Sequence, residues 1–163
     1  MLVLDIQPGR ADFMTEVQRY QVFLEQPDVG LALDGEWHTG PGQVPGVVIG
    51  SIDGKTVNQV SAWLSGIVES KGLPQKLLII HQFTPSEVVD RTAIITDRPG
   101  LATVLDIDGY GSPGTKSLKY DQLTLHTGRF FHGFKVYYRQ DPDLMAPVAI
   151  LGLRPTPDVI IYQ

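Results

Sequence analysis

Residues 77–110 read LLIIHQFTPSEVVDRTAIITDRPGLATVLDIDGY and contain two short apolar runs, Leu77–Ile80 and Leu101–Ile107. Both runs are nearly continuous and rich in Val, Ile and Leu, which is typical of strands buried on both faces of a parallel sheet. Each run ends in polar residues, His81-Gln82 in the first case and Asp106 and Asp108 in the second. A buried strand with a polar end is therefore the repeating feature to look for elsewhere.

Four more apolar runs of this kind occur in the chain: Leu2–Ile6, Val29–Leu33, Phe134–Tyr138 and Val159–Tyr162. The segments between the runs have helical features. Apolar residues recur at helical spacing from Phe13 to Leu24, after the candidate N-cap Asp12, and from Val57 to Val68, before Gly72. Three further helix starts are predicted, at Thr84-Pro85-Ser86-Glu87, Ser112-Pro113 and Asp141-Pro142, although Pro147 would break or restart the last helix.

Strands alternating with helices predict a single α/β domain over residues 1–163, with a parallel sheet. One architecture that fits is part of a TIM-barrel-like (β/α)₈ fold, and the alternative is an open doubly wound sheet. The first strand is followed by Gln7-Pro8-Gly9-Arg10, which lacks the Gly-rich nucleotide turn and favours the barrel. Because the chain begins and ends inside apolar runs, we expect a C-terminal part of a larger barrel. About two N-terminal strands would be missing, and exposed sheet edges would permit self-association.

Composition narrows the classes of function. The chain has no cysteine, which excludes a disulfide framework, Cys-ligated zinc and a thiolate nucleophile. Its net charge is −5 and it has no run of Lys or Arg, which disfavours nucleic-acid binding. The chain contains no stretch of about 18 apolar residues, so the sequence predicts no membrane span. The N-terminus lacks the features of an export signal, and composition does not assign a cellular compartment.

Polar residues at the strand ends form the candidate site, because the carboxyl ends of parallel strands meet at one edge, where such folds bind ligands. The candidate catalytic residues are Glu36, Asp34, Asp5, His81 and Asp106. The candidate substrate-binding residues are Gln7, Trp37, Gln82, Asp108, Tyr110, Tyr138 and Gln163. Any one of these carboxylates could instead cap a helix, and Asp141 before Pro142 is interpreted as such a cap.

Asp34 and Glu36 are the sharpest local feature. They lie two residues apart at a strand end, so they share a face if the strand continues. Carboxylates crowded in this way raise the pKa of at least one of them, which provides the proton-holding acid of general acid–base catalysis. His81 is the other candidate acid–base residue. No cofactor is predicted, although a divalent ion held by Asp34, Glu36, Asp106 and Asp108 is an alternative.

Asp34-Gly35-Glu36 resembles the acid-bearing strand of chitinase-like and muramidase-like glycoside hydrolases. The resemblance implies that Glu36 is the general acid and that Asp34 positions or tunes it. We therefore expect a site that acts on cell-wall glycan or another polysaccharide, with Asp34, Asp5 or Asp106 as electrostatic partner and Trp37 as a sugar platform. The alternatives are an envelope protein that binds glycan or peptide without turnover, and a metal-dependent hydrolase.

A wider resemblance covers nearly the whole chain. It is carried by residues 4–10, 27–34 and 40–46, by residues 73–78 with His81-Gln82-Phe83, by residues 98–104 and by the ending Tyr162-Gln163. In these segments the chain resembles a group of actinobacterial secreted proteins and lipoproteins of uncharacterised activity. The resemblance implies a secreted or cell-envelope location and names no reaction.

Overall fold

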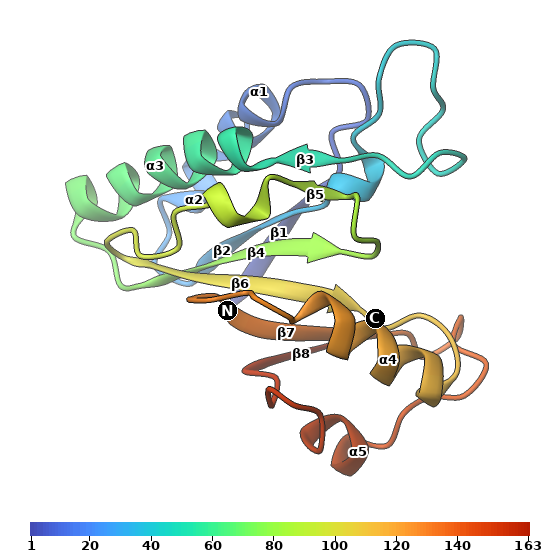
Figure 1. Cartoon of the computed structure of the whole chain (residues 1–163). Coiled ribbons are helices and arrows are strands. Elements are labelled where there is room, and N and C mark those ends of the chain that lie inside the picture. Colours follow the sequence, from blue (N-terminus) through green and yellow to red (C-terminus); the bar gives the residue numbers. More distant parts are fainter.

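The computed structural model describes all residues, 1–163, and its main feature is a six-stranded parallel sheet. The strands follow one another across the sheet in chain order: β1 (Leu2–Ile6), β2 (Val29–Leu33), β4 (Lys76–Gln82), β6 (Leu101–Asp108), β7 (Phe131–Val136) and β8 (Val159–Tyr162). A doubly wound sheet would reverse its strand order at a switch point. This sheet does not, and it curls into a half-barrel (Figure 1). The parallel, partial-barrel prediction is confirmed.

The helices all pack on one face of the sheet. They are α1 (Phe13–Gln18), α2 (Gln21–Leu24), α3 (Gly54–Lys71), α4 (Pro113–Leu123) and α5 (Pro147–Leu151). Each contributes to one core of 27 buried residues, together with alternate strand residues such as Leu33, Ile80 and Ile107. The opposite face carries a small apolar cluster of Ala32, Ile79 and Val104. The two faces of the sheet are therefore different: one is covered by helices, and the other is the inner face of the half-barrel.

Several predicted boundaries are confirmed with a physical cause. The Asp12 side chain accepts the backbone N–H of Thr15 and caps α1. The helical pattern that continues to Leu24 is divided into α1 and α2. Ser112 caps α4, with Pro113 in the first turn. Gly72 ends α3 in the left-handed conformation, at φ 60°, which glycine adopts without strain.

Three predictions about local structure are wrong. Thr84-Pro85-Ser86-Glu87 starts no helix, because β5 (Val88–Val89) follows and pairs with β3 (Ile52–Asp53). The Glu87 carboxylate still accepts the backbone N–H groups of Phe83 and Thr84, so the capping bonds form without the helix. Asp141 caps no helix either, since α5 restarts only at Pro147. Finally, β7 ends at Val136 instead of Tyr138, because the N–H of Tyr137 turns to Asp141.

None of the helices is long and apolar enough to cross a membrane.

Candidate active site

Strand alternation brings most of the predicted polar residues to the inner face. Asp34, His81 and Asp106 each lie two positions after a member of the inner apolar cluster, so they point the same way. The register pairs His81 with Asp106, Asp106 with Gly133, and Asp108 with Lys135. The carboxyl ends of β1, β2, β4, β6 and β7 therefore converge on one polar layer above an apolar half-barrel floor.

His81 lies at the centre of this layer, between two carboxylates. Its Nδ1 is 2.9 Å from Asp106 Oδ2, and its Nε2 is 3.6 Å from Asp5 Oδ1. Burial lowers the pKa of His81, but the hydrogen bond and charge of Asp106, helped by Asp5, raise it to about 9. Gly133 leaves room for this pair, since a Cβ there would overlap Asp106. His81 is therefore a protonated imidazole at neutral pH, anchored mainly by Asp106.

Asp34 organises the turn that presents Glu36. Its carboxylate accepts hydrogen bonds from Nε2 of Gln7, at 2.9 Å, and from the backbone N–H of Glu36, at 3.2 Å. The second bond caps the 3₁₀ turn η1 (Gly35–Trp37). Burial raises the pKa of Asp34, and burial followed by the charges of Asp34 and Asp108 raises the pKa of Glu36. The Glu36 carboxylate has no hydrogen bond or ion pair of its own. This is the state of a carboxylic acid that can hold a proton and release it.

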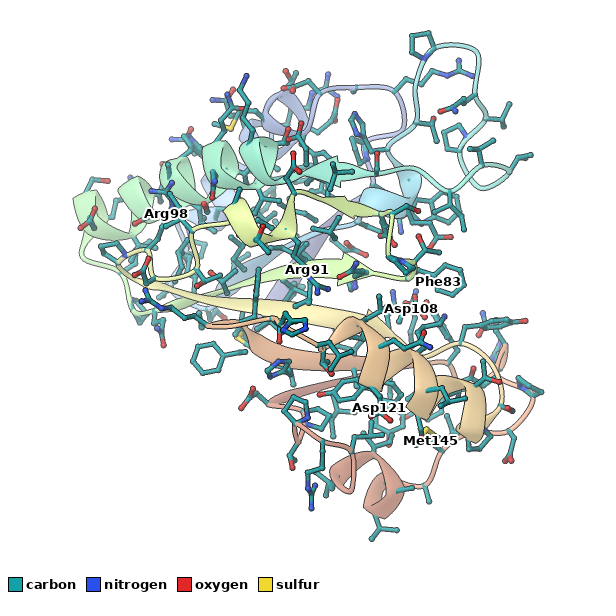
Figure 2. The ribbon with its side chains drawn as sticks, in the orientation of Figure 1. Phe83, Arg91, Arg98, Asp108, Asp121 and Met145 are labelled. Carbon is teal, nitrogen blue, oxygen red and sulfur yellow. The ribbon has the colours of Figure 1, made fainter.

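A cavity of about 250 Å³ opens beside Glu36. We call it the rim cavity, and its lining residues are Glu36, Phe83, Asp108, Tyr110, Tyr137 and Gln140. Figure 2 shows Phe83 and Asp108 near each other at the carboxyl ends of β4 and β6. Asp108 is buried and accepts a hydrogen bond from the Tyr137 hydroxyl through Oδ2, whereas its Oδ1 has no partner. Burial raises the pKa of Asp108, but the bond from Tyr137 and the charge of Lys135 oppose that shift.

Two lysines stand near these carboxylates without pairing with them. Lys119 Nζ lies 3.6 Å from the centroid of the Phe83 ring, and burial lowers the pKa of this lysine. Lys135 Nζ lies 5.4 Å from the centroid of the Tyr137 ring. Neither lysine is within 4.0 Å of a carboxylate oxygen. A further acid, Glu87, has its pKa raised to about 7, chiefly by burial.

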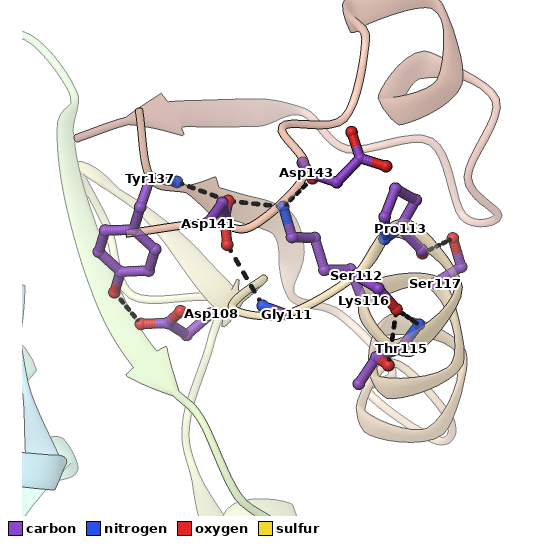
Figure 3. Close-up of polar contacts among 10 residues, drawn as sticks. All are labelled: Asp108, Gly111, Ser112, Pro113, Thr115, Lys116, Ser117, Tyr137, Asp141 and Asp143. Atoms are coloured by element: carbon purple, nitrogen blue, oxygen red, sulfur yellow. Dashed lines mark hydrogen bonds and ion pairs between the residues drawn. The ribbon is translucent and has the colours of Figure 1, made fainter. Parts of the chain in front are cut away.

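A buried ion pair supports one wall of the rim cavity (Figure 3). The Asp141 carboxylate accepts three hydrogen bonds, from Lys116 Nζ and from the backbone N–H groups of Gly111 and Tyr137. These three bonds tie α4, the turn after β6 and the end of β7 to one carboxylate. Asp141, which was interpreted as a helix cap, is instead the support that positions Tyr137 opposite Asp108.

The predicted site residues fall into three groups. Glu36, Asp108 and Tyr110 line the rim cavity, with Asp34 beneath Glu36. Asp5, His81 and Gln163 line a second, more apolar cavity of about 380 Å³ on the inner face, with Asp106 behind His81. The third group lies outside both cavities: Trp37 packs against Gly46, Gln82 bonds Thr84 and Arg91, and Tyr138 stacks on Tyr162. Gln7 serves Asp34.

Sequence reasoning missed Lys135, Tyr137, Phe83 and Lys119. The alternation of β7 offered a signal for the first two, because Gly133, Lys135 and Tyr137 share the inner face with Asp106 and Asp108. Lys119 and Phe83 meet only because α4 packs beside the end of β4, which no local pattern indicates.

The predicted alternative of a divalent-ion site is not supported by the geometry. No three His, Asp or Glu side chains converge in a way that could hold a metal ion. The Asp106 carboxylate is hydrogen-bonded to His81, and the Asp108 carboxylate to Tyr137. The Asp34 carboxylate is hydrogen-bonded to Gln7 and to the backbone of Glu36. Three of the four carboxylates proposed as ligands are therefore engaged by different partners, and the fourth, Glu36, does not converge with them on a common point.

Searches of protein-family models, curated proteins and solved structures found no match to this chain.

Proposed function

We propose that the carboxyl edge of the half-barrel is a carbohydrate-active site of the glycoside-hydrolase type, with Glu36 as general acid. The observation that carries the proposal is the contrast between two carboxylates in one cavity. Glu36 has no donor to stabilise its ionised form, and its pKa is raised by burial, Asp34 and Asp108. Asp108 has the Tyr137 hydroxyl as donor. The pKa of Asp108 is raised as well, by burial, but only Asp108 has a hydrogen-bond donor that favours its ionised form. We therefore assign Glu36 as the acid and Asp108 as the ionised partner.

The chemistry follows from these two roles. Glu36 gives its proton to the glycosidic oxygen as the bond from that oxygen to the sugar carbon breaks. Asp108 stabilises the positive charge that develops on the sugar ring. A water molecule then adds to the ring carbon, and its proton returns to Glu36. Phe83, Tyr110 and Tyr137 provide apolar surface for the face of the sugar.

The test is product release from cell-wall glycans and soluble polysaccharides by the wild-type chain and by Glu36→Gln. Because general acid catalysis contributes about 10²–10⁴-fold, Glu36→Gln should lose at least a hundredfold in rate. Glu69→Gln, an exposed change on α3, is the matched control and should retain the wild-type rate. Hydrolysis by Glu36→Gln at the wild-type rate would remove Glu36 from this role.

The exposed ring of Tyr110 at the mouth of the rim cavity also favours a second candidate, a protein that binds glycan or peptide without turnover. Binding that survives Glu36→Gln, with no glycan hydrolysed by either protein, would support this candidate. A secreted or envelope location is proposed from the family resemblance alone.

A further inference from the structure

The two carboxylates of the rim cavity both keep oxygens free for a ligand. The Glu36 carboxylate makes no hydrogen bond or ion pair, and it is only partly exposed. Asp108 is 6% exposed, and its Oδ1 is buried without any partner. A buried carboxylate oxygen without a donor is costly, and this cost is relieved by a ligand that donates a hydrogen bond.

The charge around the cavity indicates which donor fits. The charges of Asp34 and Asp108 raise the pKa of Glu36, and those of Asp34 and Glu36 raise the pKa of Glu87. The cations facing them are Lys119, Lys135 and His81. His81 is already paired with Asp106 and Asp5, and none of the three cations forms an ion pair with Glu36 or Asp108. A cationic donor would relieve this repulsion, whereas an anionic ligand would add to it.

The aromatic walls favour the same kind of ligand. Phe83, Tyr110 and Tyr137 line the cavity, and the rings of Tyr110 and Tyr137 meet edge to face with centroids 6.4 Å apart. Ring faces attract ammonium groups within about 6 Å of their centroids. Lys119 already uses the Phe83 ring in this way, at 3.6 Å. The Tyr110 ring remains exposed toward solvent and is available to a ligand.

From these observations we infer that the rim cavity binds the free ammonium group of an amino sugar. The preferred glycan then contains unacetylated glucosamine-type units in place of N-acetylated or acidic ones. The ammonium group would pair with the ionised Asp108 and donate to its free Oδ1 and to the carbonyl oxygen of the protonated Glu36, with the sugar face against Tyr110. A cavity of about 250 Å³ is small for a ligand pocket, which matches a single sugar unit. The sugar part of this inference rests on the proposed function.

The experiment is a set of NMR titrations of the wild-type chain at neutral pH with glucosamine, N-acetylglucosamine, glucuronic acid and methylammonium. These small molecules contain no glycosidic bond, so binding is measured apart from turnover. Glucosamine should bind at least tenfold more tightly than the other three, with the largest shifts at residues 109–111 and Tyr137. Its affinity should also fall as salt is raised.

Variants locate the binding. Asp108→Asn keeps an acceptor for Tyr137 but removes the charge, and it should weaken glucosamine binding at least tenfold. Tyr110→Leu, at an exposed ring, should weaken it without disturbing the fold. Asp121→Asn, an exposed change on α4, is the control and should bind like the wild type.

Three outcomes would overturn the inference: equal binding of N-acetylglucosamine, methylammonium binding as tightly as glucosamine, or glucosamine binding that Asp108→Asn leaves unchanged. If glucosamine binds no more tightly than N-acetylglucosamine while hydrolysis still depends on Glu36, only the amino-sugar inference is removed. Selective glucosamine binding without hydrolysis of any glycan would remove the catalytic proposal alone.

Discussion

Replacing Lys116 with Met should lower the free energy of unfolding by about 3–5 kcal/mol. The Lys116 and Asp141 side chains are both 0% exposed, and they pair directly with each other. Removing the ammonium leaves the Asp141 carboxylate buried with only two backbone N–H donors, from Gly111 and Tyr137. An uncompensated buried charge is far more costly than the loss of one surface ion pair. Urea denaturation followed by circular dichroism measures the change.

Two further variants sharpen this prediction. Lys55→Met removes an exposed lysine at the start of α3 and should change stability by less than about 0.5 kcal/mol. The double variant Lys116→Met with Asp141→Asn removes both charges and should recover part of the lost stability. A loss of less than about 1 kcal/mol in Lys116→Met would show that Asp141 is not an obligate member of a buried ion pair. Its role in fixing Tyr137 would then need another explanation.

The second large effect is expected at His81. Asp106→Asn removes the principal charge that raises the pKa of His81, while the burial that lowers the pKa remains. The pKa of His81 should therefore fall well below about 9, although Asp5 opposes part of the fall. NMR titration of the His81 ring protons measures this shift. Asp121→Asn, an exposed change on α4 that is not among the charges acting on His81, should leave the titration unchanged.

The same variant changes how stability depends on pH. His81 has a higher pKa in the folded chain than its ordinary value, so its contribution to stability is fully present below pH 6.5 and is lost as the pH rises through about 9. Between pH 6.5 and about 9, the free energy of unfolding of the wild type should fall because of this group. In Asp106→Asn, this fall with pH should be absent. A His81 ring that titrates near 9 in Asp106→Asn would contradict the pairing with Asp106.

Local sequence predicted the sheet well, for a physical reason. The runs Leu2–Ile6, Val29–Leu33 and Val159–Tyr162 coincide with β1, β2 and β8, because each run is largely apolar and is followed by a polar residue. The helix predicted at Thr84 failed because a capping box marks a local preference. Here the pairing of Val88 with Ile52 on another segment overrides that preference.

The candidate site was predicted in part. Period-two spacing placed Asp34, His81, Asp106 and Asp108 on one face, because alternation is a backbone property that the sequence displays directly. It did not reveal which carboxylate meets which donor. Tyr137 contacts Asp108 from a position that the bond of its backbone N–H to Asp141 fixes, and Asp141 in turn pairs with the buried Lys116. Partner choice of this kind is set by tertiary packing.

The central claim is that the carboxyl edge of the half-barrel binds carbohydrate beside Glu36. It is tested most directly by mapping backbone amide shifts in the Glu36→Gln chain as a tetramer of glucosamine is added. The geometry predicts the largest shifts around the rim cavity, at residues 36, 83, 109–111, 137 and 140. Shifts confined to the opposite end of the sheet, at residues 73–76 and 98–101, or no shifts with this tetramer at millimolar concentration, would contradict the claim.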